Sequence, residues 1–98
     1  MKILIIEDEY SLADAIAETL QNEKYTTKII TNGEDGEDEA LTNLYDLILL
    51  DVMLPRKDGF EILKKLKAEK ISAPVIMITA KSETVSYTHL TLPTMAVV

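Results

Sequence analysis

The sequence contains no cysteine, which excludes disulfide bonds and thiolate metal sites. It also has no long apolar run, since the longest stretches, such as residues 3–6 and 47–50, are far too short to cross a membrane. A signal peptide is not expected either, because only four apolar residues separate Lys2 from Glu7. We therefore expect a cytoplasmic protein with no membrane association.

Positive charge is scarce as well. The chain has 10 lysine and arginine residues against 17 aspartate and glutamate residues, which gives a net charge of −7. An acidic surface repels nucleic acid, so this chain is not expected to bind DNA itself. Its 98 residues correspond to one small domain. An apolar content of 47% fits a soluble globular protein rather than a disordered one.

Apolar blocks alternate with helical patterns along the chain. We expect buried strands at residues 2–6, 26–30, 47–50 and 75–78, and helices at residues 11–20, 34–43 and 60–69. Ser11 is predicted to cap the first helix. The alternation predicts an α/β fold, a doubly wound parallel sheet with helices on both faces. In such sheets the ligand site lies beyond the carboxyl ends of the strands.

Polar residues follow three of these strands. Glu7 and Asp8 follow the first strand, Asp51 ends the third, and Thr79 follows the fourth. A single acid after a strand is more often a helix cap or a solvated loop residue. If the strands are neighbours, however, the carboxylates converge and repel one another unless a cation lies among them. Carboxylates suit Mg²⁺, and an aspartate beside Mg²⁺ can act as a nucleophile toward phosphorus.

Three segments occur together in a specific order and spacing, namely residues 3–8, residues 49–55 with Gly59, and residues 77–80. This combination resembles the receiver domain of two-component response regulators over residues 1–84. Residues 51–55 most resemble the OmpR-type regulators, whose output is a winged-helix DNA-binding domain. The resemblance implies a flavodoxin-like receiver fold.

The resemblance also implies a role for each matching residue. Asp51 would accept the phosphoryl group. It would hold Mg²⁺ together with the side chains of Glu7 and Asp8 and the backbone carbonyl of Met53. Thr79 would be the switch hydroxyl that approaches the phosphoryl group. The chain would not be an enzyme but a phosphoacceptor that assists its own phosphorylation and dephosphorylation.

The same resemblance implies the partners. The phosphoryl donor would be a phosphohistidine on a sensor histidine kinase. DNA would be bound only through a C-terminal output domain that this chain lacks, and transcription would be the regulated process. The full-length protein could form a phosphorylation-dependent homodimer. A single-domain receiver without a DNA-binding output is an open alternative.

Two departures from the family pattern matter. Gly36 and Glu37 stand where the second helix of such domains often has small and apolar residues, so we expect that helix to be loosely packed. After Thr79 the pattern requires a helix, a strand ending in Lys-Pro and a last helix. Residues 85–98 contain no charged residue and no such lysine. Residues 85–94 instead resemble a translated adaptor from sequencing libraries, although a natural divergent terminus is the alternative.

We therefore expect residues 1–84 to form an incomplete receiver domain, truncated after the fourth strand, and residues 85–98 to be a non-native tail. Such a truncation would leave the fourth strand with an open edge and uncover apolar surface. We predict that the 98-residue chain is marginally folded or aggregates. A sharp cooperative melt together with a well-dispersed NMR spectrum would contradict this prediction. Without the lysine, we expect slow phosphorylation at best and no transmitted switch.

Other functions fit the sequence less well. A phosphohydrolase that forms an aspartyl phosphate typically has a second acid two residues after the nucleophile, where this chain has Met53. A nucleotide-binding domain needs a glycine-rich loop after the first strand, where this chain has acids at residues 7–9. A receiver-like interaction module that is never phosphorylated would not need three clustered acids.

Overall fold

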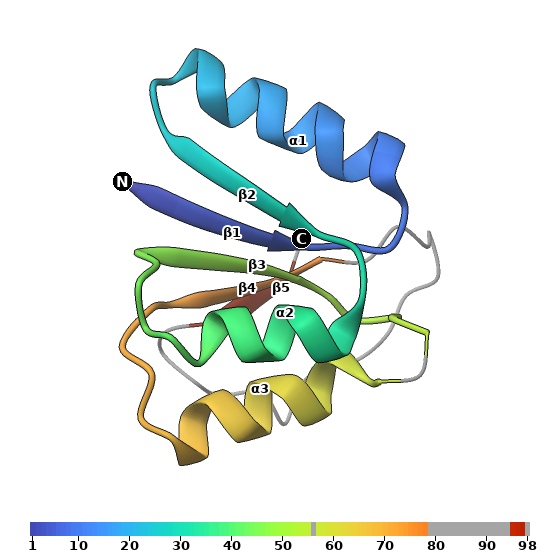
Figure 1. Ribbon diagram of the computed structural model, residues 1–98, viewed down its shortest axis with the longest axis vertical. Helices are drawn as coiled ribbons and strands as arrows, with labels where there is room; N and C mark the ends of the chain where they lie inside the picture. Colours follow the sequence, from blue (N-terminus) through green and yellow to red (C-terminus); the bar gives the residue numbers. More distant parts are fainter. Residues whose placement is uncertain (56, 79–94, 98) are drawn as a thin grey trace.

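The protein forms a single parallel sheet with helices on both faces (Figure 1), and the computed structural model describes residues 1–55, 57–78 and 95–97. The elements in chain order are β1 (Lys2–Ile6), α1 (Tyr10–Asn22), β2 (Thr26–Ile30), α2 (Gly33–Ala40), β3 (Leu47–Asp51), α3 (Gly59–Ala68), β4 (Val75–Ile78) and β5 (Met95–Val97). The strand order is β2-β1-β3-β4-β5, and every neighbouring pair is parallel. This is the strand order of flavodoxin-like sheets, so the predicted fold class is confirmed.

The core lies on both faces of the sheet. Helix α1 covers one face, and helices α2 and α3 cover the other (Figure 1). Ile3 and Ile5 of β1 pack beneath α1, whereas Leu4 and Ile6 of the same strand pack on the side of α2 and α3. Burying each such side chain stabilises the fold by about 1.5–3 kcal/mol. Two-sided burial explains why β1 is continuously apolar rather than alternating.

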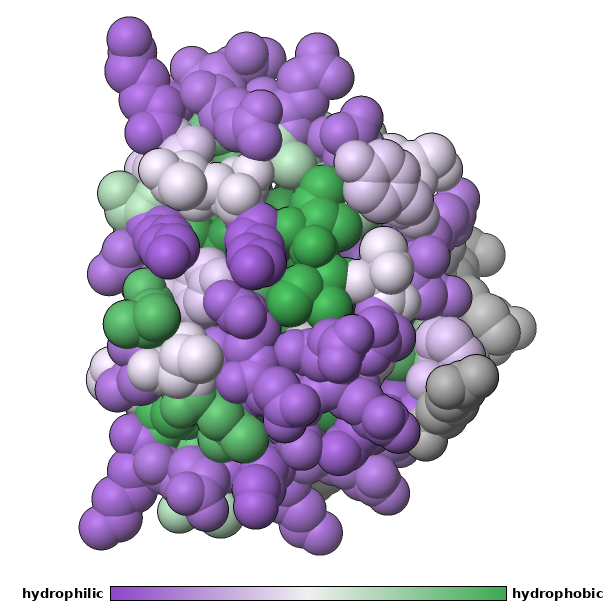
Figure 2. All heavy atoms as spheres, viewed as in Figure 1, coloured by the Kyte–Doolittle hydropathy of each residue, from purple (hydrophilic) through white to green (hydrophobic). Residues whose placement is uncertain are grey.

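Most charged residues of the described chain are exposed. Hydrophilic residues cover most of the face seen in Figure 2, and apolar patches interrupt them. Within the described ranges, no helix combines the length and the apolarity that crossing a membrane requires.

The predicted element positions agree closely with the structure. The first, second and fourth strands have the predicted bounds, and β3 extends one residue further, to Asp51. The predicted cap of α1 is wrong, because the helix begins at Tyr10 and Glu9 is its N-cap residue. Ser11 therefore lies inside the first turn, where its hydroxyl donates to the Glu9 carboxylate at 3.4 Å.

Helix α2 packs closely against β1, so the prediction of a loosely packed helix is wrong. Gly36 is buried, and a Cβ atom added to it would lie only 2.6 Å from Cγ2 of Ile6. Absence of a side chain at Gly36 lets the helix backbone approach the strand. Asn32 caps the helix by accepting a hydrogen bond from the Asp35 amide at 2.8 Å. The acids of the first turn interact favourably with the helix dipole.

The edge of β4 is occupied by the end of the chain. The sheet predicted to end at the fourth strand continues with β5, whose three residues pair in parallel with Val75, Ile76 and Met77. The prediction of an open edge is therefore wrong for these three residues. The division into residues 1–84 and a non-native tail stays a prediction, as does marginal stability.

Candidate functional site

The carboxyl ends of two central strands define the site. Strands β1 and β3 are neighbours, and Ile6 pairs with Leu50 near the end of both strands. Because parallel strands end at the same edge of the sheet, the residues that follow β1 lie beside the last residue of β3. Glu7 and Asp8 are therefore placed next to Asp51.

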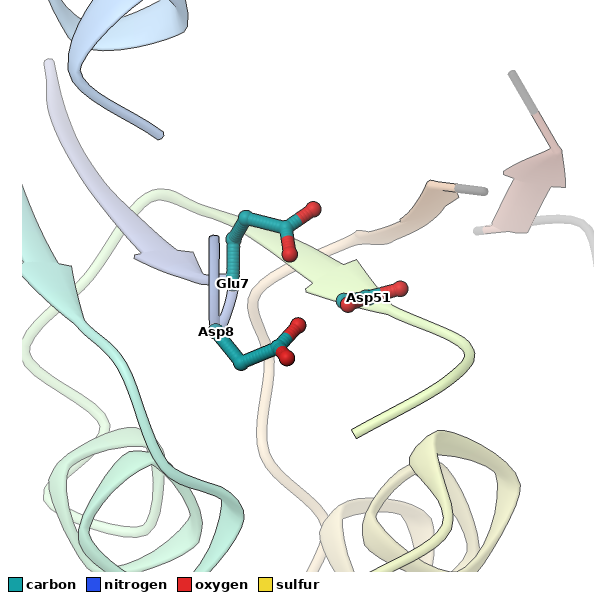
Figure 3. Close-up of side chains that lie close together, drawn as sticks. All are labelled: Glu7, Asp8 and Asp51. Atoms are coloured by element: carbon teal, nitrogen blue, oxygen red, sulfur yellow. The ribbon is translucent and has the colours of Figure 1, made fainter. Parts of the chain in front are cut away.

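The three side chains converge (Figure 3). One carboxylate oxygen from each of Glu7, Asp8 and Asp51 lies within 4.8 Å of the other two. Glu7 is 1% exposed and Asp51 is 4% exposed, whereas Asp8 is exposed to solvent. The site thus has two buried acids and one acid at its opening.

Backbone amides hold two of the carboxylates. The Glu9 amide donates to Oε2 of Glu7 at 3.1 Å, and the Met53 amide donates to Oδ1 of Asp51 at 3.0 Å. The other oxygen of Glu7, Oε1, is buried and has no hydrogen-bond partner within the described part of the chain. A buried carboxylate oxygen without a partner carries a desolvation penalty that a ligand can remove.

The electrostatics of the cluster favour a bound proton or cation. Burial raises the pKa of Glu7 from 4.5 to about 8, and the neighbouring Asp51 carboxyl adds to this rise. Burial also raises the pKa of Asp51 above its ordinary value of 3.8. Near neutral pH, Glu7 therefore holds a proton unless a cation takes its place.

The donor set fits Mg²⁺. Three carboxylates in mutual reach, one of them with an unpartnered buried oxygen, supply hard oxygen ligands. A divalent cation would compensate the negative charge of these carboxylates, whose pKa values burial and their mutual proximity raise. The backbone carbonyl of Met53 belongs to the loop that follows Asp51, so the predicted further ligand comes from the same edge of the sheet.

The loop between β3 and α3 forms the rim of the site. The Gly59 amide donates to the Val52 carbonyl at 3.2 Å, which closes the loop at its base. A hollow of about 500 Å³ lies along this loop and is lined by six residues: Val52, Met53, Leu54, Lys57, Asp58 and Phe60. The hollow lies along the loop that follows Asp51.

Not every residue predicted for the site can be placed. Strand β4 lies beside β3, and its last residue, Ile78, pairs with Asp51. Thr79, the predicted switch hydroxyl, lies outside the described residues. Sequence reasoning missed Lys57, whose ammonium group forms an ion pair with Glu37 at 2.9 Å. No sequence signal links these two residues, because they lie on different elements.

Comparison with known proteins identifies the family. The sequence model of one protein family, the response regulator receiver domain, matches residues 3–93 of this chain. The chain belongs to this family. The expected resemblance to receiver domains of OmpR-type transcriptional regulators is thereby confirmed, and the relatives agree with it.

Two curated relatives of this receiver domain are transcriptional or response regulators. The transcriptional regulatory protein DltR of Streptococcus agalactiae serotype III (strain NEM316) is 43% identical over 84 residues, which cover 86% of this chain and 38% of that protein. The response regulator ArlR of Staphylococcus aureus (strain Mu50 / ATCC 700699) is 47% identical over 83 residues, which cover 85% of this chain and 37% of that protein. The receiver domain thus spans less than two fifths of either relative.

Solved structures show the same fold. The response regulator TrrA of Thermotoga maritima, determined in complex with Mg²⁺ and BeF, has a TM-score of 0.80 at 27% identity and covers 99% of this chain and 84% of its own. The receiver domain of the Francisella response regulator 1452 has a TM-score of 0.77 at 31% identity, with 85% of this chain and 69% of its own covered. Both similarities extend over most of the sheet and its helices.

Proposed function

We propose that this receiver domain accepts a phosphoryl group on Asp51, with Mg²⁺ held by Glu7, Asp8, Asp51 and the carbonyl of Met53. Receiver domains act with histidine kinases in two-component systems, and a phosphohistidine of a sensor kinase is the proposed donor. The proposed output is transcription, through a DNA-binding domain outside this chain, with phosphorylation-dependent homodimerisation of the full-length protein. The relatives that are transcriptional regulators support this output, and the cytoplasm is the proposed location.

One observation carries the proposal. Three carboxylates lie within 4.8 Å of one another, and a buried oxygen of Glu7 has no partner among the residues that the structure describes. A role in stability alone does not explain this arrangement, because clustered carboxylates repel one another and raise their pKa values. The complex of TrrA with Mg²⁺ and BeF supports the same assignment by similarity.

The chemistry follows from the position of Asp51. One oxygen of its carboxylate accepts the Met53 amide, which fixes the orientation of the group. A carboxylate oxygen attacks the phosphorus, an O–P bond forms, and the N–P bond of phosphohistidine breaks with its electron pair passing to the imidazole nitrogen. Bound Mg²⁺ would offset charge on the phosphoryl oxygens. The chain is therefore a phosphoacceptor that assists its own phosphorylation, and Thr79 is the proposed hydroxyl donor to the phosphoryl group.

The direct test is labelling of the 98-residue chain with acetyl phosphate and Mg²⁺, followed by intact-protein mass spectrometry. We expect one phosphoryl group, placed on Asp51, and no labelling when a chelator removes Mg²⁺ before acetyl phosphate is added. We expect labelling at least about ten-fold slower than in a complete receiver domain, because the charge of the family's lysine is missing.

The controls separate Asp51 from other acids. Asp51→Asn should abolish labelling. Asp46→Asn should not change it, because Asp46 lies before β3, at the opposite end of the strand, where its carboxylate accepts the Lys2 amide at 2.7 Å. Labelling that persists in Asp51→Asn, or that does not depend on Mg²⁺, would disprove the proposed function. Labelling as fast as in a complete receiver domain would leave the proposed function intact and disprove only the expected slower rate.

A further inference from the structure

Helix α2 contacts residues beside two parts of the candidate site, namely Ile6, directly before Glu7, and Lys57 in the loop that follows β3. Its Gly36 lies against Ile6, the residue directly before Glu7, so closely that an added Cβ would be 2.6 Å from the isoleucine side chain. This contact fixes the helix relative to the strand that supplies two of the acids. The next residue of the helix, Glu37, contacts Lys57 in the loop after β3.

Glu37 and Lys57 form an ion pair across 20 residues of sequence. The Lys57 ammonium donates to Oε1 of Glu37 at 2.9 Å. The side chains are 12% and 28% exposed, respectively, so this pair is less accessible to water than the other described ion pairs. The stem of Lys57 also lies against the first turn of α2, because a Cβ added to Gly33 would be 2.9 Å from Cβ of Lys57.

Lys57 is connected to the site through the loop that carries Met53. Its own amide donates to the Pro55 carbonyl at 2.8 Å, which makes a tight turn in the loop. At the base of the loop, the Gly59 amide bonds the Val52 carbonyl, and the Met53 amide bonds Asp51. The loop is thus held at its base by β3 and further along by α2.

We propose that Glu37 and Lys57 are a positioning pair for the metal site. Helix α2 contacts Ile6, which precedes Glu7 and Asp8, and through the ion pair it also holds the loop that carries Met53. The pair thus keeps the Met53 carbonyl at a fixed position relative to the two acids. The pair thereby sets the affinity for Mg²⁺ without touching the ion. This inference rests on the proposed function, since it assumes that the acids and the Met53 carbonyl bind Mg²⁺.

Two simpler roles give different results. If the pair only stabilises the fold, its loss lowers the free energy of unfolding and leaves the Mg²⁺ dissociation constant of the folded chain unchanged. If the two charges act on Mg²⁺ only through space, Glu37→Gln weakens binding and Lys57→Met strengthens it. A positioning role requires that both substitutions weaken binding.

The experiment measures the Mg²⁺ dissociation constant of the 98-residue chain by NMR titration, with urea unfolding in parallel. We expect Glu37→Gln and Lys57→Met each to weaken binding by about three- to ten-fold, less than the loss of a group that contacts a metal ligand directly. Lys57→Arg keeps the charge and should stay within about two-fold of the unsubstituted chain. Glu69→Gln is the matched control, because it removes an acid from an exposed pair with Lys65 at 3.9 Å, and it should leave binding unchanged.

Each outcome decides the matter. Unchanged Mg²⁺ binding in both Glu37→Gln and Lys57→Met, or shifts in opposite directions, would overturn the positioning role while leaving the proposed function intact. If Glu37→Gln fails to fold, the comparison of Lys57→Met with Lys57→Arg gives the answer. If the unsubstituted chain binds no Mg²⁺, the proposed function fails, and the positioning role fails with it.

Discussion

Without Mg²⁺, the chain should lose stability as the pH rises from about 4.5 to about 8, the two pKa values of Glu7 in the unfolded and folded states. The folded state binds this proton more tightly than the unfolded state. The resulting stabilisation is fully present below pH 4.5 and is lost as the pH passes the folded-state pKa of about 8. The raised pKa of Asp51 acts in the same direction. We expect a combined loss of several kcal/mol.

Mg²⁺ should reverse this loss, and more effectively at pH 8 than at pH 5. At the lower pH the cation must displace the Glu7 proton, whereas at the higher pH the proton has largely left. Urea unfolding at both pH values, with a chelator or with saturating Mg²⁺, measures the effect. Glu7→Gln removes the titrating group and should flatten the metal-free profile. A metal-free stability that is constant or rises between pH 5 and pH 8 would contradict the expectation.

The substitution Gly59→Ala should be the most damaging single methyl group that can be added near the site. Its Cβ would lie 2.4 Å from the Asp51 carbonyl oxygen and 3.0 Å from the Val52 Cα atom. Both neighbours are backbone atoms of the strand end and of the loop, so they can move only if the site is distorted. We expect a loss of about 3 kcal/mol in the free energy of unfolding, together with loss of Mg²⁺ binding.

Gly33→Ala is the matched control, because Gly33 begins α2 as Gly59 begins α3. The neighbours of the added methyl group would be side chains, namely those of Lys57, Ile62 and Leu54. The contacts with Ile62 and Leu54 would be ordinary van der Waals distances, so only the Lys57 Cβ, at 2.9 Å, has to shift together with its loop backbone. The loss should therefore be smaller than for Gly59→Ala, about 1 kcal/mol. Urea unfolding and NMR dispersion compare the two variants. Equal losses of unfolding free energy in Gly59→Ala and Gly33→Ala would show that the contact with the Asp51 backbone does not cause the larger destabilisation.

The sequence was sufficient to predict the first four strands and the acids at the ends of β1 and β3. Continuous apolar runs mark strands that are buried on both faces, and their bounds follow from the polar residues on either side. The convergence of Glu7, Asp8 and Asp51 then follows from the geometry of a parallel sheet, because neighbouring strands end at one edge. These features depend on local pattern and on one topological rule.

Two of the errors, those on α2 and on β5, arose where a single contact between residues far apart in the sequence decides the structure. The family pattern at Gly36 and Glu37 predicts a loosely packed α2, yet Gly36 allows the helix to approach Ile6, and Glu37 pairs with Lys57. Neither partner is visible in the sequence around the helix. Pairing of β5 with β4 was missed for the same reason, since a segment of three residues carries too little pattern to predict a strand.

The placement of the acids also has a consequence for hydrogen exchange. Strands β1 and β3 have a neighbouring strand on each side and are covered on both faces, so their amides should open only in the largest unfolding events. Fraying of the helices or detachment of β5 would leave these two strands paired. We therefore expect the carboxylates of Glu7 and Asp51 to extend from the slowest-exchanging part of the described chain, so that smaller local openings leave them aligned.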